Sequence, residues 1–461
     1  MKLPFDIAGD LDTPVSAFAK LTPFEPRFLL ESVEGGERLG RYSFIGFGDV
    51  LEVRLDDSGF RIGDELRPVP NGREALLDGL RAALKLVPLP LPALGQVPLA
   101  GGLVGFTAYD VVRFFERLPQ RLAPLADVPL LHYVAPRSLL VFDHVSRGIA
   151  LLHAGSDAER ESLRREVIAA LRGAVPRIAT GGKFSAPAPA LSRDAYMSGV
   201  RRAQEYIAAG DVYQLVLASR FTGRHDLDPF QVYRALRLIN PSPYMYLCRL
   251  GNMTVVGSSP EALVKLNGRE AQLRPIAGTR PRADDAQADA RLEAELRADI
   301  KENAEHVMLV DLARNDLGRV ARAGSVRVEP YRSIERYSHV MHIVSGVSGE
   351  LAAQRDAFDL FAATFPAGTL VGAPKVRAME IIEELEPVRR GLYGGTIGYF
   401  GAHGAMDQAI TIRTLVFHGD EYSYQAGAGI VADSQPAAEH DEVLAKSAAL
   451  LRSLKLAEAG L

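Results

Sequence analysis

The order of strand-like and helix-like runs constrains the fold of this chain most strongly, because the two kinds do not alternate. The first 172 residues contain mainly short β-like runs, with one amphipathic stretch at 73–86. The second part mixes strand-like segments with two long helical segments, at 287–317 and 435–457. A doubly wound fold would require strict β-α-β alternation, so this order predicts an α+β architecture instead. The β-like runs of the first part are residues 41–47, 50–55, 139–142 and 149–152.

The length predicts two or three domains, because 461 residues are too many for one compact core. Residues 174–193 are rich in Pro, Ala, Gly and Ser, which is typical of a linker or a surface crossing. Near its end, Ser192 is the expected cap of a helix that ends at Gly210. The predicted division is therefore one region at 1–180 and a second at 190–461.

Charge and hydropathy exclude several classes of partner. With 53 basic and 57 acidic residues the formal net charge is −4, so no global attraction to nucleic acid or to an anionic membrane is expected. The first ten residues lack the apolar run of a secretory signal, and the longest apolar stretch, at 86–98, is broken by prolines. We therefore expect a cytoplasmic protein. The single cysteine, Cys248, excludes an intramolecular disulfide, and its apolar neighbours predict a buried thiol.

Two pairs of glutamates lie on two separate predicted helices. Glu302 and Glu305 stand three residues apart, and Glu439 and Glu442 repeat this spacing, which places both members of a pair on one helix face. Two such pairs that faced one cavity would supply the hard oxygen ligands that Mg²⁺ prefers. Solvated helix faces are the alternative, because exposed glutamates are common and the spacing alone does not decide between the two.

Two glycine-containing runs have the composition of loops that bind anions. Residues 366–375 superficially resemble a phosphate loop, but the neighbours of Lys375 do not fit G-x-x-x-x-G-K-[ST], so no nucleotide site is expected. The run instead predicts a tight loop that opens a helix at 375–385, whose first amides could face an anion. Residues 425–430 either bring backbone N–H groups close to a carboxylate or form a plain turn.

Arg413 is a permanent cation in an apolar, strand-like segment at 410–415. In such a setting it needs an anionic partner, from the protein or from a ligand. Tyr399 ends another strand-like segment, where it either donates its hydroxyl to the same anion or packs in the core.

Together these segments resemble the family of chorismate-utilising enzymes. The resemblance covers essentially the whole chain and is densest between residues 190 and 450. It implies large mixed or antiparallel sheets packed with outer helices, with the two predicted regions interleaved. Eight runs carry the resemblance in the family's order: residues 210–214, 240–245, 257–261, 274–282, 304–316, 337–342, 372–375 and 426–430.

The family implies how the candidate residues contact chorismate. Four glutamates would hold Mg²⁺, directly or through water, and the metal would bind the ring carboxylate of the substrate. Tyr399 and Arg413 would hold the enolpyruvyl carboxylate. Gly278 and Thr279 would line the same pocket. The implied metal ligands are Glu302, Glu305, Glu439 and Glu442, and the implied helpers at the ring carboxylate are Gly427, Ala428, Gly429 and Lys446.

Two positions indicate which nucleophile reaches ring carbon 2. Isochorismate-type enzymes are thought to activate water with a lysine where this chain has Gln214, and a glutamine cannot act as a base. Many aminodeoxychorismate synthases carry a nucleophilic lysine where this chain has Ala277. With water and a lysine amine disfavoured at these two positions, ammonia is the expected nucleophile. The chain is therefore most similar to the anthranilate synthase component I branch, and aminodeoxychorismate synthase component I is the alternative.

The same resemblance implies a catalytic set of Glu261, His342 and Thr369. Glu261 would protonate the hydroxyl that leaves carbon 4, and His342 would assist proton transfer as pyruvate leaves. Without the resemblance, Glu261 would be interpreted as an exposed turn residue and His342 as a core histidine. One departure from the family is Val371, where a small polar residue is usual.

The resemblance also implies a protein partner and an inhibitor. The chain contains no glutaminase-like Cys/His arrangement, so ammonia is expected from a separate glutamine amidotransferase subunit, component II, in a hetero-oligomer. Tryptophan is expected to bind as a feedback inhibitor. A strand followed by a proline turn is the alternative for that segment, and a tryptophan-binding protein without catalysis is the alternative for the whole chain. The residues that map onto the tryptophan site are Ser32, Arg41, Pro243, Tyr244 and Met245.

Overall fold

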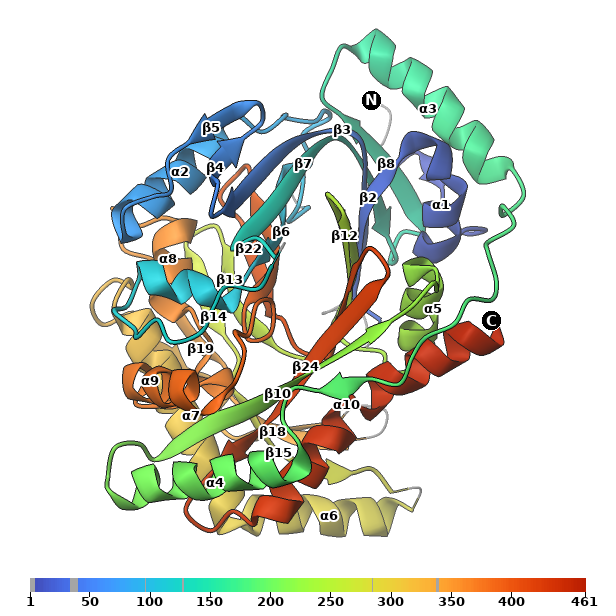
Figure 1. The fold of residues 1–461 in the computed structure, drawn as a ribbon. Coiled ribbons are helices and arrows are strands. Elements are labelled where there is room, and N and C mark those ends of the chain that lie inside the picture. The colour runs from blue at the N-terminus through green and yellow to red at the C-terminus, as the bar shows by residue number, and fades with distance from the viewer. Residues whose placement is uncertain (1–4, 34–39, 96, 127, 284, 337–339) are drawn as a thin grey trace.

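Strands fill the interior of the molecule and helices surround them (Figure 1). The computed structural model describes residues 5–33, 40–95, 97–126, 128–283, 285–336 and 340–461. The helices are α1 (Pro14–Lys20), α2 (Arg73–Lys85), α3 (Asp157–Arg172), α4 (Arg193–Ala208), α5 (Pro229–Ile239), α6 (Ala286–Ala298), α7 (Ile300–Gly318), α8 (Ala357–Thr364), α9 (Lys375–Leu385) and α10 (Pro436–Ala459), with 3₁₀ turns η1 (Thr22–Phe24), η3 (Tyr109–Phe114) and η4 (Gly368–Leu370).

Within the described ranges, 21 strands are joined by hydrogen bonds into one large antiparallel sheet, and three more form a small sheet. The predicted α+β class is confirmed. The small sheet consists of β15 (Ile276–Pro281), β17 (Ser333–Arg336) and β18 (Val340–Val344). The large sheet contains β1 (Ile7–Ala8), β2 (Pro26–Glu31), β3 (Tyr42–Asp56), β4 (Gly59–Ile62), β5 (Glu65–Arg67), β6 (Gly102–Thr107), β7 (Leu131–Asp143), β8 (Gly148–His153), β9 (Ala188–Pro189), β10 (Gln214–Arg224), β11 (Tyr244–Leu250), β12 (Met253–Ser259), β13 (Ala262–Asn267), β14 (Glu270–Leu273), β16 (Arg327–Val328), β19 (Val347–Glu350), β20 (Gly372–Ala373), β21 (Thr396–Gly401), β22 (Met406–Ile410), β23 (Thr414–His418) and β24 (Glu421–Ile430).

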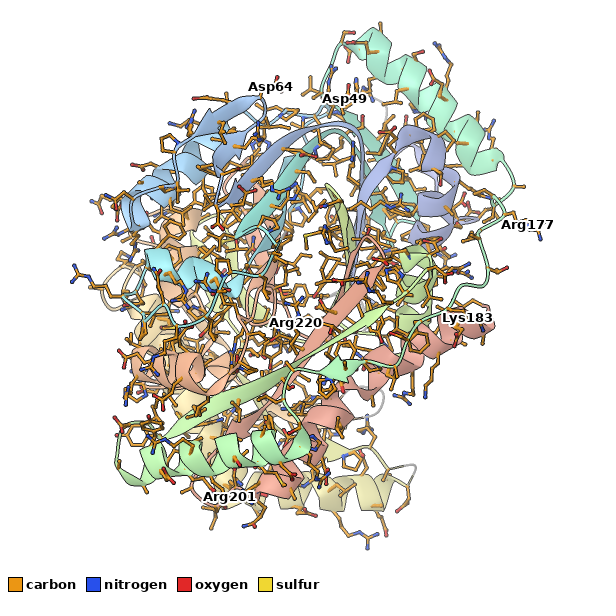
Figure 2. The ribbon with its side chains drawn as sticks, in the orientation of Figure 1. Asp49, Asp64, Arg177, Lys183, Arg201 and Arg220 are labelled. Carbon is orange, nitrogen blue, oxygen red and sulfur yellow. The ribbon has the colours of Figure 1, made fainter. Side chains whose placement is uncertain are left out.

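Strands from the two predicted regions pair with each other directly. Leu29 of β2 lies opposite Leu247 of β11, and Phe106 of β6 lies opposite Ile397 of β21. The segment between the regions, residues 174–193, runs along the surface, where Arg177 and Lys183 point outward (Figure 2). Residues before and after this segment therefore share one sheet.

The two faces of the sheet pack into separate core clusters, and β11 shows how. Met245 and Leu247 belong to one cluster, and Tyr246 and Cys248 belong to the other, as the alternation of side chains along a strand requires. Cys248 is fully buried, so its predicted place in the core is confirmed, and burial raises the pKa of its thiol to about 12. The described residues contain no helix that is long and apolar enough to cross a membrane.

Local capping signals set the helix boundaries near the site. The hydroxyl of Ser192 accepts a hydrogen bond from the N–H of Ala195 and begins α4, as predicted. The prediction of a single helix at 287–317 is wrong in one respect. The structure has two helices there, α6 and α7. Asp299 interrupts them: its backbone is extended, and its carboxylate caps α7 by accepting from the N–H of Glu302 at 3.0 Å.

Candidate active site

A cavity of about 750 Å³ is lined by residues of α7, α10, β15, β18 and β24. These elements are far apart in the chain, and the sheet brings them together. The predicted site residues that line the cavity are Pro243, Glu261, Gly278, Thr279, Glu302, Glu305, His342, Thr369, Arg413, Gly427, Gly429, Glu439, Glu442 and Lys446.

The two glutamate pairs face this cavity from the first turns of α7 and α10. The Nε2 of Gln214 donates to Oε1 of Glu305 at 3.3 Å. On α10 the ammonium of Lys446 lies 2.7 Å from Oε1 of Glu442. Both pairs therefore line one cavity, with the Glu442 side chain 47% exposed at its rim.

Burial and neighbouring carboxylates raise the pKa of two of these glutamates, although Arg280 acts against this at Glu302, as do Lys301 and Lys446 at Glu439. Desolvation and then the neighbouring Glu305 raise the pKa of Glu302, and desolvation together with Glu442 raises the pKa of Glu439. The Oε2 atom of Glu439 is buried and has no hydrogen-bond partner among the described residues. A buried, unpartnered carboxylate oxygen in a cavity that three further glutamates line fits a hard divalent cation such as Mg²⁺. Among the described residues no group of three or more His, Cys, Asp or Glu side chains is placed to hold a metal ion, so a cation bound here would take most of its ligands from water or from a bound anion, as Mg²⁺ commonly does.

Glu261 and Thr369 form a hydrogen-bonded pair at the cavity wall. The Thr369 hydroxyl donates to Oε1 of Glu261 at 3.0 Å. Burial raises the pKa of Glu261 from 4.5 to about 7, although Thr369, Arg413 and Lys446 act in the opposite direction. A carboxyl group with this pKa is partly protonated near neutral pH and can donate a proton in a reaction.

His342 is held by the strand opposite it in the small sheet. Its Nδ1 lies 2.9 Å from the carbonyl oxygen of Gly278 and 3.1 Å from the hydroxyl of Thr279. Because a carbonyl can only accept, Nδ1 carries the proton in this contact, and Nε2 is then the proton acceptor of the ring. Gly278 has a φ of 64°, and a β-carbon there would lie 2.8 Å from Leu296 of α6, so this close approach requires glycine.

Arg413 lines the cavity from a break between two strands. The strand predicted across 410–415 ends at Ile410, and the next begins at Thr414. Arg413 lies in the break with a φ of 49°, which costs a non-glycine residue about 1 kcal/mol. Its guanidinium is one of the positive charges that lower the pKa of Glu261, so Arg413 and Glu261 interact electrostatically within the same cavity.

Tyr399 does not line the cavity, so the structure does not place it where it was predicted to act. It lies opposite Asp407 in the β21–β22 pair, within the second core cluster, and burial beside Asp407 and Tyr244 raises its pKa well above the ordinary value. Tyr393, in the turn before β21, lines the cavity instead. A β-carbon on Gly427 would lie 2.8 Å from its hydroxyl. Sequence reasoning missed Tyr393 because it lies in a turn before β21, and only the fold brings that turn to the cavity.

The glycine run of β24 is a strand and not a turn. Gly427 and Gly429 line the cavity, whereas Ala428 is fully buried on the opposite face and is not a lining residue, because successive positions of a strand alternate. The Nζ of Lys446 donates to the carbonyl of Gly427 at 3.1 Å. A β-carbon on Gly429 would lie 2.7 Å from Nε2 of Gln214, so the absence of side chains keeps this wall open.

The loop at 366–375 ends at α9, which covers Lys375–Leu385 as predicted. Val371 is fully buried in the first core cluster, so the residue at this position packs away from the cavity. Lys375 is paired with Asp316 and does not contribute to the cavity wall.

The predicted tryptophan residues lie partly on two paired strands. Glu31, the last residue of β2, pairs with Met245 of β11, so Ser32 lies close to the start of β11. The Ser32 hydroxyl is buried and has no hydrogen-bond partner in the described part of the chain. Pro243 lines the large cavity, which brings this segment next to the proposed substrate space.

The other two members of the tryptophan set have protein partners. Tyr244 donates to Oδ1 of Asp407 at 3.0 Å, and Arg41 pairs with Asp143 at 3.2 Å. Residues 34–39 of the same segment lie outside the described residues, as do residues 337–339 of the run at 337–342.

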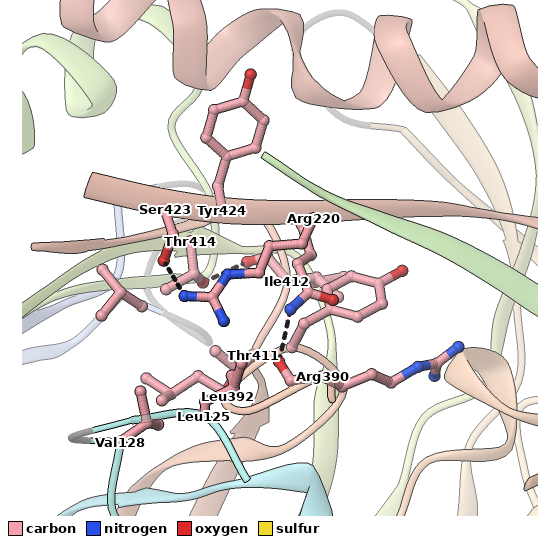
Figure 3. Close-up of a pocket in the computed structure, with 13 residues that line it drawn as sticks. Leu125, Val128, Arg220, Arg390, Leu392, Thr411, Ile412, Thr414, Ser423 and Tyr424 are labelled. Atoms are coloured by element: carbon pink, nitrogen blue, oxygen red, sulfur yellow. Dashed lines mark hydrogen bonds between the residues drawn. The ribbon is translucent and has the colours of Figure 1, made fainter. Parts of the chain in front are cut away.

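A second cavity of about 30 Å³ shares Tyr393, Ile412 and Gln425 with the large one. Arg220 extends into it and donates to the Ser423 hydroxyl at 3.3 Å (Figure 3). Its volume is enough for about one or two water molecules, so it enlarges the site only slightly.

Comparison with known proteins agrees with this geometry. The profile of one family, described as chorismate binding enzyme, matches residues 25–452. The chain is 48% identical over 460 residues to "Anthranilate synthase component 1" of Thermus thermophilus, with 98% of this chain and 97% of that protein covered. It is 46% identical to the protein of the same name from Streptomyces coelicolor, covering 98% and 89% of the two chains. The crystal structure of anthranilate synthase component I from Streptococcus pneumoniae superposes with a TM-score of 0.80 at 34% identity, covering 89% of this chain and 92% of that one. The chain therefore belongs to the chorismate-binding enzyme family, among its anthranilate synthase component 1 members.

Proposed function

We propose that this chain is the large subunit of an anthranilate synthase, which converts chorismate and ammonia to anthranilate and pyruvate in tryptophan biosynthesis. The observation that carries the proposal is the shared cavity, in which four carboxylates and Arg413 line the same space. Such a cavity can hold a substrate with two carboxylates, one through a cation and the other directly on a guanidinium.

The four glutamates would hold Mg²⁺ beside the ring carboxylate of chorismate. When bound, the metal polarises that carboxylate and fixes its orientation. Gly427 and Gly429 leave room for the ring, because neither has a side chain. Arg413 and the hydroxyl of Tyr393 would bind the enolpyruvyl carboxylate, with Tyr393 in the role first assigned to Tyr399.

Glu261 and His342 would handle the protons. Ammonia adds at ring carbon 2 while the carbon-4 hydroxyl leaves as water, and protonated Glu261 supplies the proton for it. The Thr369 hydroxyl stabilises the carboxylate that this transfer leaves behind. His342 then accepts a proton at Nε2 as pyruvate is eliminated and the ring becomes aromatic.

Ammonia would come from a separate glutamine amidotransferase subunit, because ammonium and not ammonia dominates at neutral pH. The only cysteine, Cys248, is fully buried with its pKa raised, so it is not suited to act as a glutaminase nucleophile. The name "component 1" of the relatives supports such a partner. Tryptophan would inhibit by binding near Ser32 and Pro243, beside the substrate cavity.

The deciding experiment mixes the purified chain with chorismate, Mg²⁺ and an ammonium salt and follows anthranilate fluorescence. The proposal predicts turnover without any partner at high ammonium concentration. Consumption of chorismate without anthranilate would favour an aminodeoxychorismate product. A thermal shift with tryptophan but none with chorismate, and no turnover, would contradict the proposal and favour a non-catalytic tryptophan-binding protein.

A further inference from the structure

The ammonium of Lys375 joins three helices next to the cavity, and none of the proposed steps uses it. Its Nζ lies 2.5 Å from Oδ2 of Asp316, near the end of α7, and 3.2 Å from the carbonyl of Thr364, the last residue of α8. Lys375 itself is the first residue of α9. Helices α7, α8 and α9 are found on the same side of the molecule (Figure 1). Both partners of the ion pair are largely buried, with 15% and 13% of their side chains exposed, so water screens this pair little.

The contact with Thr364 closes a loop that carries the partner of Glu261. The chain leaves α8 at Thr364 and returns at Lys375, and Thr369 lies between them. One ammonium therefore holds both ends of the loop. Fixing the two ends reduces the number of conformations that the loop can adopt, which favours one position of the Thr369 hydroxyl.

The loop is also packed against α7, the helix that carries Glu302 and Glu305. A β-carbon on Gly368 would lie 2.9 Å from Leu312 of α7 and 3.6 Å from the stem of Lys375. Leu370 accepts a hydrogen bond from the buried Arg390 at 2.6 Å. The loop is thus tied to α7 on one side and to Arg390 on the other, with Thr369 between the two ties.

A small cavity of about 50 Å³ connects the ion pair to Glu261. Glu261, Thr369, Gly368 and Asp316 all line it. Asp316 is therefore a second carboxylate on the wall of the small cavity that Glu261 lines, and it is paired with Lys375. Loss of the lysine would both release the loop and leave this carboxylate without its counter-ion.

We propose that the Asp316–Lys375 ion pair is a positioning device for Glu261, which holds the loop so that the Thr369 hydroxyl donates to the Glu261 carboxylate. This inference rests on the proposed function, in which Glu261 is the acid. Lys375 and Asp316 are positioning residues, because neither lines the substrate cavity. The hydrogen bond makes Glu261 a stronger acid, because it stabilises the carboxylate that remains after proton transfer.

Several charged residues other than Lys375 act on Glu261 or line its two cavities. The test must therefore distinguish the effect of Lys375 from theirs. Arg413 and Lys446 lower the pKa of Glu261 from the large cavity. The titratable residues that line the two cavities with Glu261 are Arg274, Lys301, Glu302, Glu305, Asp316, His342, Tyr393, Arg413, Glu439, Glu442 and Lys446. In a Lys375 variant all of these residues stay in place, and only the loop and the counter-charge of Asp316 change.

The test compares Lys375→Met with Lys375→Arg in steady-state assays of anthranilate formation across pH. The methionine variant should lose about 10- to 100-fold in kcat, with KM for chorismate changed less than about twofold, because a misplaced loop affects the proton donor and not substrate contacts. The basic limb of its pH profile should move to higher pH, because loss of the Thr369 hydrogen bond raises the pKa of Glu261. Lys375→Arg should recover most of the activity. The matched control is Arg322→Met, which breaks the exposed Arg322–Glu350 pair at 2.6 Å and should change neither quantity.

A second variant keeps the inference testable if Lys375→Met does not fold. Asp316→Asn, which removes the other half of the ion pair, should show the same loss in kcat and the same movement of the basic limb as Thr369→Val, and the double variant of these two should lose no more than either single one. Additive losses would overturn the inference, as would a Lys375→Met protein with a lower Tm but unchanged kcat and pH profile. Wild-type protein that forms no anthranilate would contradict the proposed function itself, whereas active wild type with an equally active Lys375→Met contradicts the positioning role alone.

Discussion

Glu261→Gln separates the effect of burying a carboxyl group on stability from its effect on catalysis. A rise in pKa from 4.5 to about 7 means that the ionised carboxylate is disfavoured in the folded protein by about 3 kcal/mol. Glutamine has the shape of the protonated acid and does not ionise. The variant should therefore be the more stable protein at high pH.

The pH window follows from the direction of the shift. Between about pH 4.5 and 7 the folded wild type keeps a proton that the unfolded chain releases, so its stability falls as the pH rises through this range. The stability advantage of the variant should be small below pH 4.5 and should reach about 3 kcal/mol above pH 7. Activity should go in the opposite direction, with kcat at least about 100-fold lower in the variant, because the proton donor is lost.

Urea unfolding followed by circular dichroism at pH 5 and pH 8 measures this difference. The advantage of Glu261→Gln should be about 2 kcal/mol larger at pH 8 than at pH 5. Glu421→Gln is a suitable control, since the Glu421 side chain is 60% exposed and the substitution should change stability by less than about 0.5 kcal/mol at either pH. If the advantage of Glu261→Gln were the same at both pH values, the carboxyl would not titrate as its burial requires, and its assignment as the acid would lose its basis.

Three further predictions concern the metal, the substrate and the inhibitor. Glu442→Gln should abolish turnover and the rise in Tm on adding Mg²⁺ while tryptophan still binds; retained activity would count against the metal assignment. Tyr393→Phe should raise KM for chorismate about 10-fold, and Tyr399→Phe should leave it within about twofold; the reverse order in steady-state assays would restore Tyr399 to the substrate site. The chain contains no tryptophan residue, so the emission of added tryptophan reports binding directly. Ser32→Ala should weaken that binding about 5-fold, and unchanged affinity would remove Ser32 from the inhibitor site.

Features that depend on neighbouring residues were predictable from the sequence. The cap at Ser192, the helix at 375–385 and the buried thiol of Cys248 all follow from a few residues on either side. The spacing within each glutamate pair also fixed which side chains share a helix face, because the period of a helix is constant. The break at Asp299 belongs to this class as well, since an aspartate three residues before Glu302 is a capping signal that the long helical pattern concealed.

The tertiary structure decided which of these features meet. Tyr393, in the turn before β21, lines the cavity, whereas Tyr399, within β21, lies in the second core cluster, and the folded path of that turn decided this. The alternation of side chains along β24 removes Ala428 from a wall that Gly427 and Gly429 form. Local preferences extend over about one helical turn or one strand repeat, whereas the cavity depends on pairing between distant strands, so its membership was decided only when the chain folded.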